Sequence, residues 1–562
     1  MNVLQIRTYL KDKDSVPPVT TPEYEEWLEC ADALEFLVSS ATDHVPIYVS
    51  SKYFYLYAVL IPKQRLKGEY VADLMQWNFA ASTGWGYSIR FTSRRPTIEP
   101  PLDCTGSSIL DGGEPIFFLR NLYEDDNSYL EVNQKLAHLL EVHQVNQRNA
   151  YCKIDKDTGD LVDVITFSQD DGILCTMDRA ALDSYLFLTN SVLIRVFDVT
   201  RWGGSFSGWQ GDIKKDIYTD KVHELYAQRS IKLVDNGKKE AGYVRGIQII
   251  RQDQPNSKLM REFSWISKKK KEYATFIALD WKHEKVQECS CDPEKLGNFF
   301  VESDLPYELT PAFFNPEVVL RYKQYPDKYT IDFETISCRN TWNLRYRTND
   351  TGQIQVYLID LAHLPTREQL YWKTFNEKPK AGVAERVYKR DFLGSWDPIP
   401  NPLGVLKHTI SKFPRIKYQG EEIAIMRCPT EKQLAKLTYV MTDSRKEWED
   451  QILELAKLFG DGLDKKELRK VSKYLRCDDS QLGSMNLLKK CLETRGLDTE
   501  DVQCIMQPWQ TLYGLRSSGI AHTGRNAPDV NLKDHHKHLV EDCSTSLKQL
   551  AELIRTGYLD IP

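Results

Sequence analysis

The sequence predicts an α+β region that ends near residue 429, followed by an all-α helical bundle. Up to about Cys428, short apolar and aromatic runs alternate with turn residues, as is typical of strands with intervening helices. From Thr430 on, apolar residues recur at spacings of three, four and seven, the period of an amphipathic helix. The chain has 562 residues, of which 41% are hydrophobic and 27% charged. These values indicate about three to five globular domains and exclude disordered and fibrous classes.

The first region contains the predicted strands, which are runs of apolar and aromatic residues bounded by turns. Two of them are joined as a hairpin by the Asp-Lys-Asp-Thr-Gly-Asp sequence of residues 155–160. Strands are expected at 53–61, 116–119, 151–154, 162–167, 192–199, 247–251, 274–281 and 354–359, and helices at 128–143, 177–186 and 366–376.

The α+β region is long enough for two domains, with the boundary expected in the polar stretch 233–240. The lysine run 268–271 is a second candidate for this boundary. The resulting division is a domain at 1–235, a second α+β domain for sensing or recognition at 236–429, and a helical effector domain at 430–562.

The helical region begins with a capping box, Thr430-Glu431-Lys432-Gln433, in which the hydroxyl and the amide bond each other's backbone N–H groups. An apolar stripe from Leu434 to Phe459 then predicts one long helix that ends at Gly460-Asp461-Gly462. Further helices are expected at 464–475, 480–494, 499–518 and 532–556.

Charge and cysteine content restrict the class of protein. The 74 Lys and Arg against 80 Asp and Glu exclude a polybasic nucleic-acid binder, so any RNA contact has to be local. The first residues lack the apolar core of a signal peptide, and the most apolar early run is too short to span a membrane. Twelve Cys at uneven spacings then favour free thiols. We expect a cytoplasmic protein without membrane contact.

Arg516 is the first residue that indicates chemistry. It follows Trp509 by seven residues and Leu512 by four, which places it on a helix face that is otherwise apolar. Gly519 is a natural helix breaker, and the turn it permits would bring His522 back beside Arg516. A straight helix would not, because six residues rotate a side chain by ~600°. The two side chains could then meet one phosphate.

The sequence Arg-Ser-Ser-Gly-Ile-Ala-His at 516–522 resembles the Arg-x(4-6)-His motif of the HEPN superfamily, the higher eukaryote and prokaryote nucleotide-binding domains. The resemblance covers 430–562 and includes the motif's place before the last long helix. It implies a ribonuclease without metal or cofactor, in which Arg516 and His522 are catalytic. The family's active nucleases usually have Asn, Asp or His after the Arg, whereas this sequence has Ser517, which can still donate a hydrogen bond.

The chemistry that the motif would support is transesterification. A ribose 2'-OH attacks the adjacent phosphate, and the 5'-oxygen leaves as a 2',3'-cyclic phosphate forms. His522 is suited to proton transfer near neutral pH, and Arg516 to the charge of the phosphorane. In the family, two chains combine their Arg and His residues in one site, so we expect a homodimer, with the stripe 434–459 as the candidate partner surface.

Other basic residues are candidates for RNA binding. Lys268, Lys269, Lys270 and Lys271 form the strongest positive run, although a solvated loop explains such a run equally well. His535 and His538 could line the groove of Arg516 and touch RNA. We expect these histidines, with His536 between them, on a solvated first helical turn and not around a metal ion, because their spacing does not converge on one ion.

Three other motifs indicate no site. Cys289 and Cys291 lack a second pair at zinc-finger spacing, so free thiols are expected. Asp332 and Glu334 are expected on an exposed strand face. The glycine-rich segments match neither a phosphate loop nor a nucleophile elbow, which argues against an ordinary ATPase or serine hydrolase.

The resemblance therefore implies an endoribonuclease effector of bacterial anti-phage, abortive-infection defence. Its substrate would be RNA, with tRNA as one candidate, and a phage-derived trigger would be a further partner. One alternative is a HEPN module without catalysis that serves as a dimerisation or nucleotide-binding platform, and Ser517 is the residue that favours it. Another places the main activity in the N-terminal region, where the sequence contains no catalytic constellation.

Overall fold

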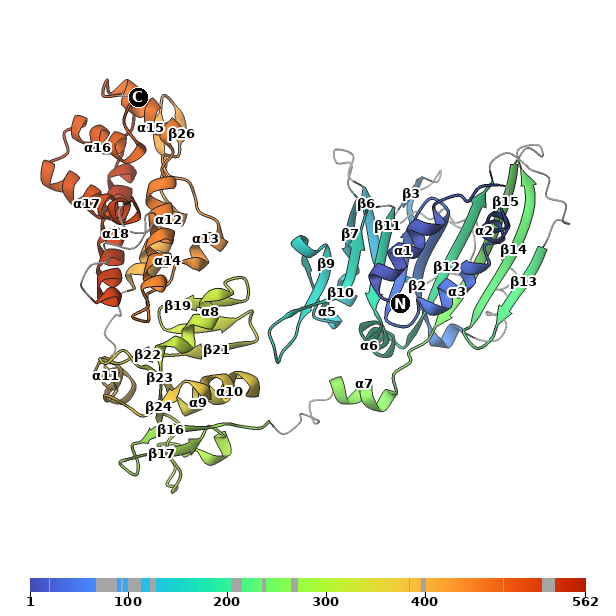
Figure 1. Ribbon diagram of the computed structural model, residues 1–562, viewed down its shortest axis with the longest axis horizontal. Helices are drawn as coiled ribbons and strands as arrows, with labels where there is room; N and C mark the ends of the chain where they lie inside the picture. The colour runs from blue at the N-terminus through green and yellow to red at the C-terminus, as the bar shows by residue number, and fades with distance from the viewer. Residues whose placement is uncertain are drawn as a thin grey trace. The chain divides into compact units, whose positions relative to one another are not determined.

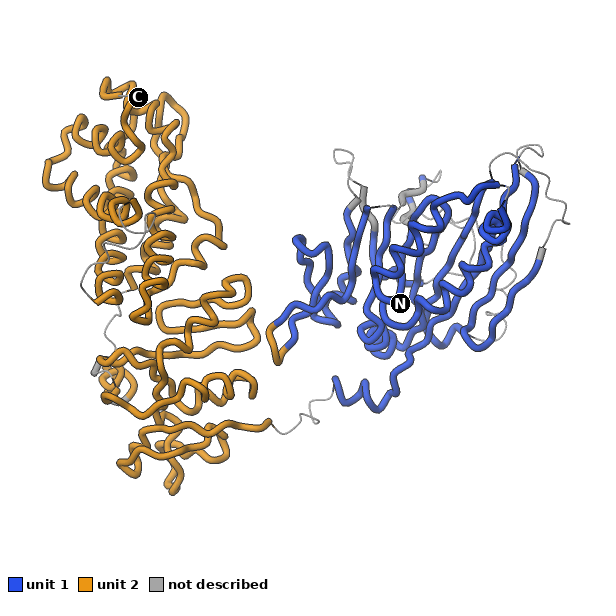
Figure 2. The backbone as a smooth tube through the Cα atoms, in the orientation of Figure 1, with its two compact units in different colours: residues 1–155, 160–269 blue, residues 156–159, 270–562 orange. Residues whose placement is uncertain are grey.

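The structure, a computed structural model, describes residues 1–19, 21–66, 88–91, 95–99, 113–121, 128–170, 172–203, 215–234, 239–263, 271–383, 385–395, 401–478, 480–517 and 531–562. Two compact units divide the chain (Figure 2). Unit 1 comprises Met1–Asp155 and Asp160–Lys269, and unit 2 comprises Lys156–Gly159 and Lys270–Pro562. None of the described helices combines the length and the apolar character needed to cross a membrane.

Unit 1 is built on an antiparallel sheet of 11 strands (Figure 1). Its strands are β1 (His44–Ser50), β2 (Phe54–Pro62), β5 (Glu114–Pro115), β8 (His143–Val145), β9 (Ala150–Ile154), β10 (Leu161–Ser168), β11 (Ile173–Asp178), β12 (Ser191–Trp202), β13 (Lys215–Asp220), β14 (Leu225–Val234) and β15 (Lys239–Ile250). Their order is β13-β14-β15-β12-β2-β1-β11-β10-β9-β8, and β5 pairs with β2.

Helices cover both faces of this sheet, which explains why its central strands are apolar without alternation. Leu174 of β11 packs with Ile6 and Leu37 on one face, while the next residue, Cys175, packs with Leu182 on the other. The first face carries α1 (Val3–Lys13), α2 (Pro22–Glu29) and α3 (Ala31–Ser39); the second carries α5 (Gln134–Leu139), α6 (Arg179–Thr189) and the hairpin of β6 (Phe117–Asn121) and β7 (Ser128–Val132). Unit 1 also contains β3 (Ser88–Phe91), β4 (Pro96–Glu99), α7 (Asn256–Phe263) and the 3-10 turns Lys63–Arg65 and Asn146–Arg148.

Unit 2 begins with a smaller α+β part around its own core of buried residues. It contains β16 (Thr275–Asp280), β17 (Lys285–Ser290), β18 (Pro311–Phe314), β19 (Tyr329–Asp332), β20 (Thr335–Cys338), β21 (Trp342–Arg345), β22 (Arg347–Thr348), β23 (Ile354–Tyr357) and β24 (Asn376–Glu377). One sheet has the order β17-β16-β18-β23-β22, with β24 paired to β18, and the second has the order β19-β20-β21. The helices are α8 (Leu320–Gln324), α9 (Leu358–His363), α10 (Thr366–Thr374) and α11 (Glu385–Leu393), with 3-10 turns at Pro293–Lys295 and Pro316–Val319.

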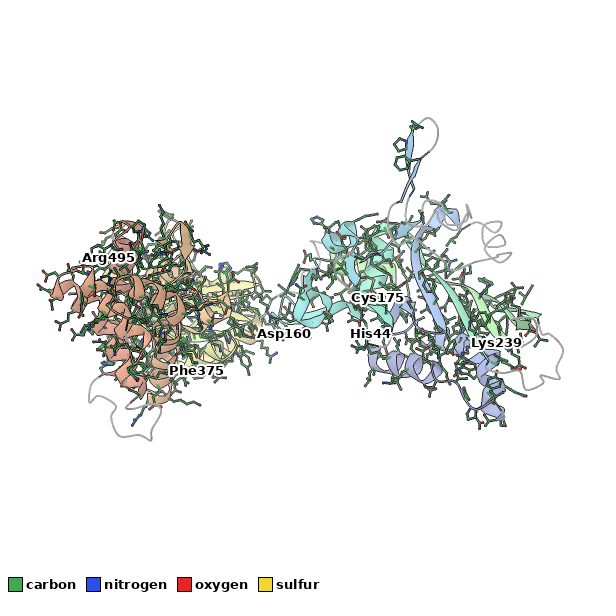
Figure 3. The ribbon with its side chains drawn as sticks, turned by 90° about the horizontal axis from the view of Figure 1, so that it is seen from above. His44, Asp160, Cys175, Lys239, Phe375 and Arg495 are labelled. Atoms are coloured by element: carbon green, nitrogen blue, oxygen red, sulfur yellow. The ribbon has the colours of Figure 1, made fainter. Side chains whose placement is uncertain are left out.

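The rest of unit 2 is helical and is organised around the last long helix (Figure 1). Its elements are α12 (Pro402–Ser411), the hairpin of β25 (Ile416–Tyr418) and β26 (Glu421–Ile423), α13 (Glu431–Lys436), α14 (Arg445–Ala456), a π-helical turn (Lys457–Asp461), α15 (Lys465–Tyr474), α16 (Ser484–Thr494), α17 (Thr499–Leu515) and α18 (Leu532–Arg555). Arg495, labelled in Figure 3, donates to the carbonyl oxygen of Asp560 and ties α16 to the segment after α18. An α+β region followed by C-terminal helices is thus the observed class.

The predicted helix over 128–143 is wrong in its first part. Leu130 and Val132 are buried in β7, which pairs with β6. Asn133 then caps α5, because its side chain accepts a hydrogen bond from the N–H of Lys135 at 2.9 Å. The alternation of buried residues in 128–132 has the period of a strand, which the helix prediction overlooked.

The prediction of one long helix over 434–459 is wrong, because the structure divides this range between α13 and α14. The capping box at Thr430 is confirmed, but α13 ends at Lys436. α14 then begins at Arg445, after the N-cap residue Ser444, whose hydroxyl accepts a hydrogen bond from the N–H of Glu447. Between them, residues 437–444 form neither helix nor strand, and several are β-branched or aromatic residues of low helix propensity. The apolar stripe is buried in this chain's own core and is therefore not a free partner surface; Leu437, Trp448, Ile452, Leu455 and Phe459 are each at most 2% exposed.

Of the two boundaries suggested for the α+β region, the structure divides the chain at the second, the lysine run 268–271. The position at 235–236 falls within the hairpin of β14 and β15, where Leu233 pairs with Glu240. The two compact units instead divide within the lysine run, between Lys269 and Lys270. The helical part begins before residue 430, because Leu406 of α12 and Ile416 of β25 are buried in the same core as α14 to α18.

Candidate functional site

Arg516 lies at the surface, where the buried face of α17 ends. Trp509 and Leu512, on the preceding turns, are completely buried. Arg516 caps the helix, and its side chain is 33% exposed. Its Nη1 donates to both carboxylate oxygens of Asp461, at 3.2 and 3.1 Å. The sequence placed Arg516 on the apolar face; the structure places it at the exposed end of that face.

Asp461 is positioned by the π-helical turn that continues α14. A Cβ at Gly462 would lie 1.9 Å from the carbonyl oxygen of Leu458, so this turn requires glycine at position 462. A Cβ at Gly460 would lie 3.7 Å from Nη1 of Arg516, which shows that the guanidinium runs along this glycine. The sequence indicated only a helix end here. It gave no signal that Asp461 would meet Arg516.

Of the other two predicted catalytic residues, the structure describes Ser517 but not His522. Ser517 is exposed, and its hydroxyl lies 2.9 Å from the carbonyl oxygen of Tyr513 and 3.2 Å from that of Gly514, within its own helical turn. His522 lies outside the described residues, as does Gly519.

His535 and His538 lie on the first turns of α18 but are not at the contact between Arg516 and Asp461. His535 accepts a hydrogen bond at Nδ1 from the indole N–H of Trp448 at 3.3 Å, and burial lowers its pKa. Trp448 is in the first turn of α14, whereas Asp461 is the last residue of the π-helical turn that follows α14. The contact of His535 with Trp448 and that of Arg516 with Asp461 are therefore about 20 Å apart along the helix. His538 is 74% exposed and lies 3.4 Å from the carboxylate of Glu541.

The prediction of a solvated histidine cluster is wrong for His536. This side chain is 1% exposed, and its Nδ1 accepts from the N–H of Val440 at 3.4 Å. Burial, together with the nearby charges of Lys323 and His535, lowers its pKa to about 3. The spacing to Val540 and Cys543, four and seven residues on, places His536 on the buried face of α18.

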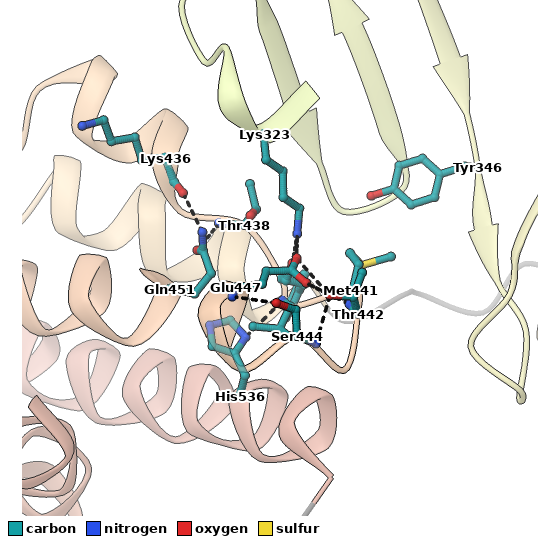
Figure 4. Close-up of polar contacts among 12 residues, drawn as sticks. Lys323, Tyr346, Lys436, Thr438, Met441, Thr442, Ser444, Glu447, Gln451 and His536 are labelled. Atoms are coloured by element: carbon teal, nitrogen blue, oxygen red, sulfur yellow. Dashed lines mark hydrogen bonds and ion pairs between the residues drawn. The ribbon is translucent and has the colours of Figure 1, made fainter. Parts of the chain in front are cut away.

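A buried polar cluster joins the α+β part of unit 2 to its helices (Figure 4). The ammonium of Lys323, on α8, pairs with the carboxylate of Glu447, on α14, and donates to the carbonyl oxygen of Tyr439 at 2.5 Å. The carboxylate also accepts from the N–H groups of Met441 and Thr442, at 3.1 and 2.9 Å. Burial opposes the charge of Glu447, but Lys323 and Thr442 hold its pKa below the usual range.

This cluster explains why the chain between α13 and α14 is not helical, since side chains take the place of helical hydrogen-bond partners. Sequence reasoning missed it, because Lys323 and Glu447 have no pattern that distinguishes them from surface residues.

The one described residue of the predicted lysine run has an internal role. Lys271 donates to the carbonyl oxygen of Ala362 at 2.6 Å, near the end of α9, and its ammonium lies 5.4 Å from the ring centroid of Tyr273. Burial lowers its pKa. Lys268, Lys269 and Lys270 lie outside the described residues.

The cysteine and carboxylate motifs of the sequence do not form a metal site among the described residues. No group of three or more His, Cys, Asp or Glu there is placed to hold an ion. Cys289 and Cys291 are buried free thiols, and burial raises the pKa of each to about 11. Glu334 does not lie on an exposed strand face as predicted, because it pairs with Arg347 at 3.0 Å and is 14% exposed.

Comparisons with known proteins identify no relative: no protein-family model, no curated protein and no solved structure matches this chain. The residues themselves therefore carry the functional argument.

Proposed function

We propose that this protein is a metal-independent endoribonuclease of the HEPN type, with Arg516 and His522 as its catalytic pair. The observation that carries the proposal is the position of Arg516. Its guanidinium is at the surface, where a buried helix face ends, in a helical region that closes with one long helix. A guanidinium at such an edge is accessible to a phosphate, whereas one inside the core would not be.

In this proposal the two residues divide the work of transesterification. His522 takes the proton of the ribose 2'-OH or returns one to the leaving 5'-oxygen, and Arg516 stabilises the charge on the phosphorane oxygens. Ser517 donates to the same phosphate after its hydroxyl turns away from the carbonyl of Tyr513. The product is a 2',3'-cyclic phosphate, and DNA is not cleaved because it lacks the 2'-OH.

A composite site needs a second copy of the chain, and the outer face of α17 supports that arrangement. Between Val502 and Leu515 its exposed residues are uncharged: Gln503, Cys504, Gln507, Gln510, Thr511 and Tyr513. Depletion of charge and exposed Tyr, here 54% for Tyr513, are typical of interfaces. Light scattering should give a dimer mass for the native chain and a monomer mass for Tyr513→Arg. A native monomer that cleaves RNA would contradict the composite site.

The biological role proposed with this activity is that of an effector in bacterial anti-phage defence, in which the region before the helices senses a trigger and restrains the nuclease. A free ribonuclease would damage its own cell, which motivates the restraint. In this proposal the restraint limits the nuclease in the cell without abolishing cleavage by the concentrated purified chain. Expression of the full chain should therefore leave growth unchanged until infection, and growth arrest without infection would contradict a restrained resting state.

A non-catalytic HEPN platform remains the second candidate function, and Ser517 favours it. Its hydroxyl already bonds within its own turn, at the position where active nucleases of the family have Asn, Asp or His. RNA cleavage assays on the full chain in EDTA decide between the two functions. The nuclease proposal expects cleavage of single-stranded or tRNA-like RNA that is lost in His522→Ala. Activity that requires Mg²⁺, or that persists in this variant, would overturn it.

A further inference from the structure

The ion pair between Arg516 and Asp461 places a carboxylate where the proposed function requires a phosphate. We propose that Asp461 is a built-in competitor, which holds Arg516 in the free chain and yields it to a phosphodiester of bound RNA. This inference rests on the proposed function in one respect: Arg516 is taken to contact the RNA backbone.

The geometry supports an exchange of partners. Both oxygens of Asp461 are close to the same nitrogen, Nη1, at 3.1 and 3.2 Å. Among the described residues, no other acceptor bonds the guanidinium, so Nε and Nη2 are left for a second anion. The Asp461 side chain is 61% exposed, and that of Arg516 33%, so an anion can approach from solvent.

The energetics favour a phosphate once RNA is present. An exposed ion pair is weak, because water screens it and both side chains lose freedom. A phosphodiester can engage the planar guanidinium through two parallel hydrogen bonds, which are stronger than contacts through one nitrogen. Asp461 therefore delays or weakens binding without preventing it.

The opposite role for Asp461 would be to orient Arg516 toward the substrate. The two roles predict opposite changes in RNA affinity when Asp461 is neutralised. If Asp461 competes, its neutralisation tightens RNA binding; if it orients Arg516, neutralisation weakens binding. Asp461→Asn keeps the size of the side chain and removes the charge, so the sign of the change in affinity is decisive.

The test is fluorescence anisotropy on the full chain, with a short labelled single-stranded RNA whose riboses carry 2'-O-methyl groups and so cannot be cleaved. We expect Asp461→Asn to lower the Kd by about two- to fivefold, the range that an exposed ion pair permits. Glu449→Gln is the matched control, because Glu449 lies on α14, the helix that precedes the turn of Asp461, is paired with Arg445 at 2.8 Å and loses the same charge. Its Kd should not change.

A double variant shows whether the effect acts through Arg516. In the Arg516→Ala background, Asp461→Asn should give no further change in Kd. An unchanged or higher Kd for Asp461→Asn alone would overturn the inference, as would tightening that persists without Arg516. Cleavage of unmodified RNA in EDTA, measured in parallel, reports separately on the proposed function: competition without cleavage supports the inference and rejects the nuclease.

Discussion

The first turn of α18 contains a histidine that stays neutral in the folded chain. His536 is buried against Val440 and Tyr439, and the nearby Lys323 ammonium further disfavours its protonation. The three histidines of this turn looked alike in the sequence. Their environments differ because one turn of helix faces the core, the edge and the solvent in succession.

We predict that the protonation of His536 lowers the free energy of unfolding in mild acid. Its folded pKa is about 3, against ~6.5 in the unfolded chain, so between these values only the unfolded chain takes up the proton. Stability should therefore drop as the pH falls below ~6.5, by about 2 kcal/mol at pH ~5. Urea denaturation followed by helical circular dichroism at both pH values measures this loss.

His536→Gln should remove that part of the pH dependence, because its amide oxygen can still accept from Val440 without titrating. His538→Gln is the control, since His538 is 74% exposed, and it should keep the pH dependence of the native chain. The account of His536 fails if both variants lose the same stability in acid.

Among helices and strands, the sequence signals of capping and turn residues predicted where an element begins better than where it ends. The capping box at Thr430 is present, and the hairpin between β9 and β10 was expected from its turn residues. The end of α13 was not, because its cause is a set of hydrogen-bond partners from other helices: side-chain acceptors of α14 and the ammonium donor of Lys323 on α8. Such partners are distant in sequence, so a periodicity analysis cannot detect them.

The turn after α14 gives the second prediction. Gly462→Ala should destabilise the helical region by about 1–3 kcal/mol, because the new Cβ would lie 1.9 Å from the carbonyl oxygen of Leu458. In α17, a Cβ at Gly514 would meet no heavy atom of the described residues within 4 Å beyond the helix's own backbone. Gly514→Ala should therefore gain up to ~1 kcal/mol from helix propensity. Thermal unfolding of the two variants tests this; equal effects of the same sign would contradict the close approach at Gly462.

At the scale of the whole molecule, the sequence predicted the class of each region but not how distant strands pair. β1 pairs with β11, so that Val49 lies opposite Leu174 in a sheet assembled from both halves of unit 1. The sequence also separated the α+β region from the helices at 429, whereas the helical core includes α12 and the hairpin of β25 and β26. Both features depend on long-range packing, which local patterns do not encode.

A fragment experiment follows from that core. Residues 401–562 should form a stable helical fragment, whereas 430–562 should not, because it lacks Leu406, Ile410 and Ile416, which are at most 1% exposed. Each buried aliphatic side chain contributes about 1.5–3 kcal/mol. Circular dichroism melts of both fragments measure the difference. A cooperative transition of equal midpoint in 430–562 would show that α12 and the hairpin are not part of this core.

The chemistry of the product ends shows whether Arg516 takes part in RNA cleavage without a metal ion. RNA is incubated with the full chain in EDTA, and the fragments are analysed by mass spectrometry. We expect 2',3'-cyclic phosphate ends that disappear in Arg516→Ala and persist in the control variant Glu449→Gln. Fragments with 3'-hydroxyl ends, or cyclic phosphate ends formed equally by Arg516→Ala, would contradict this expectation.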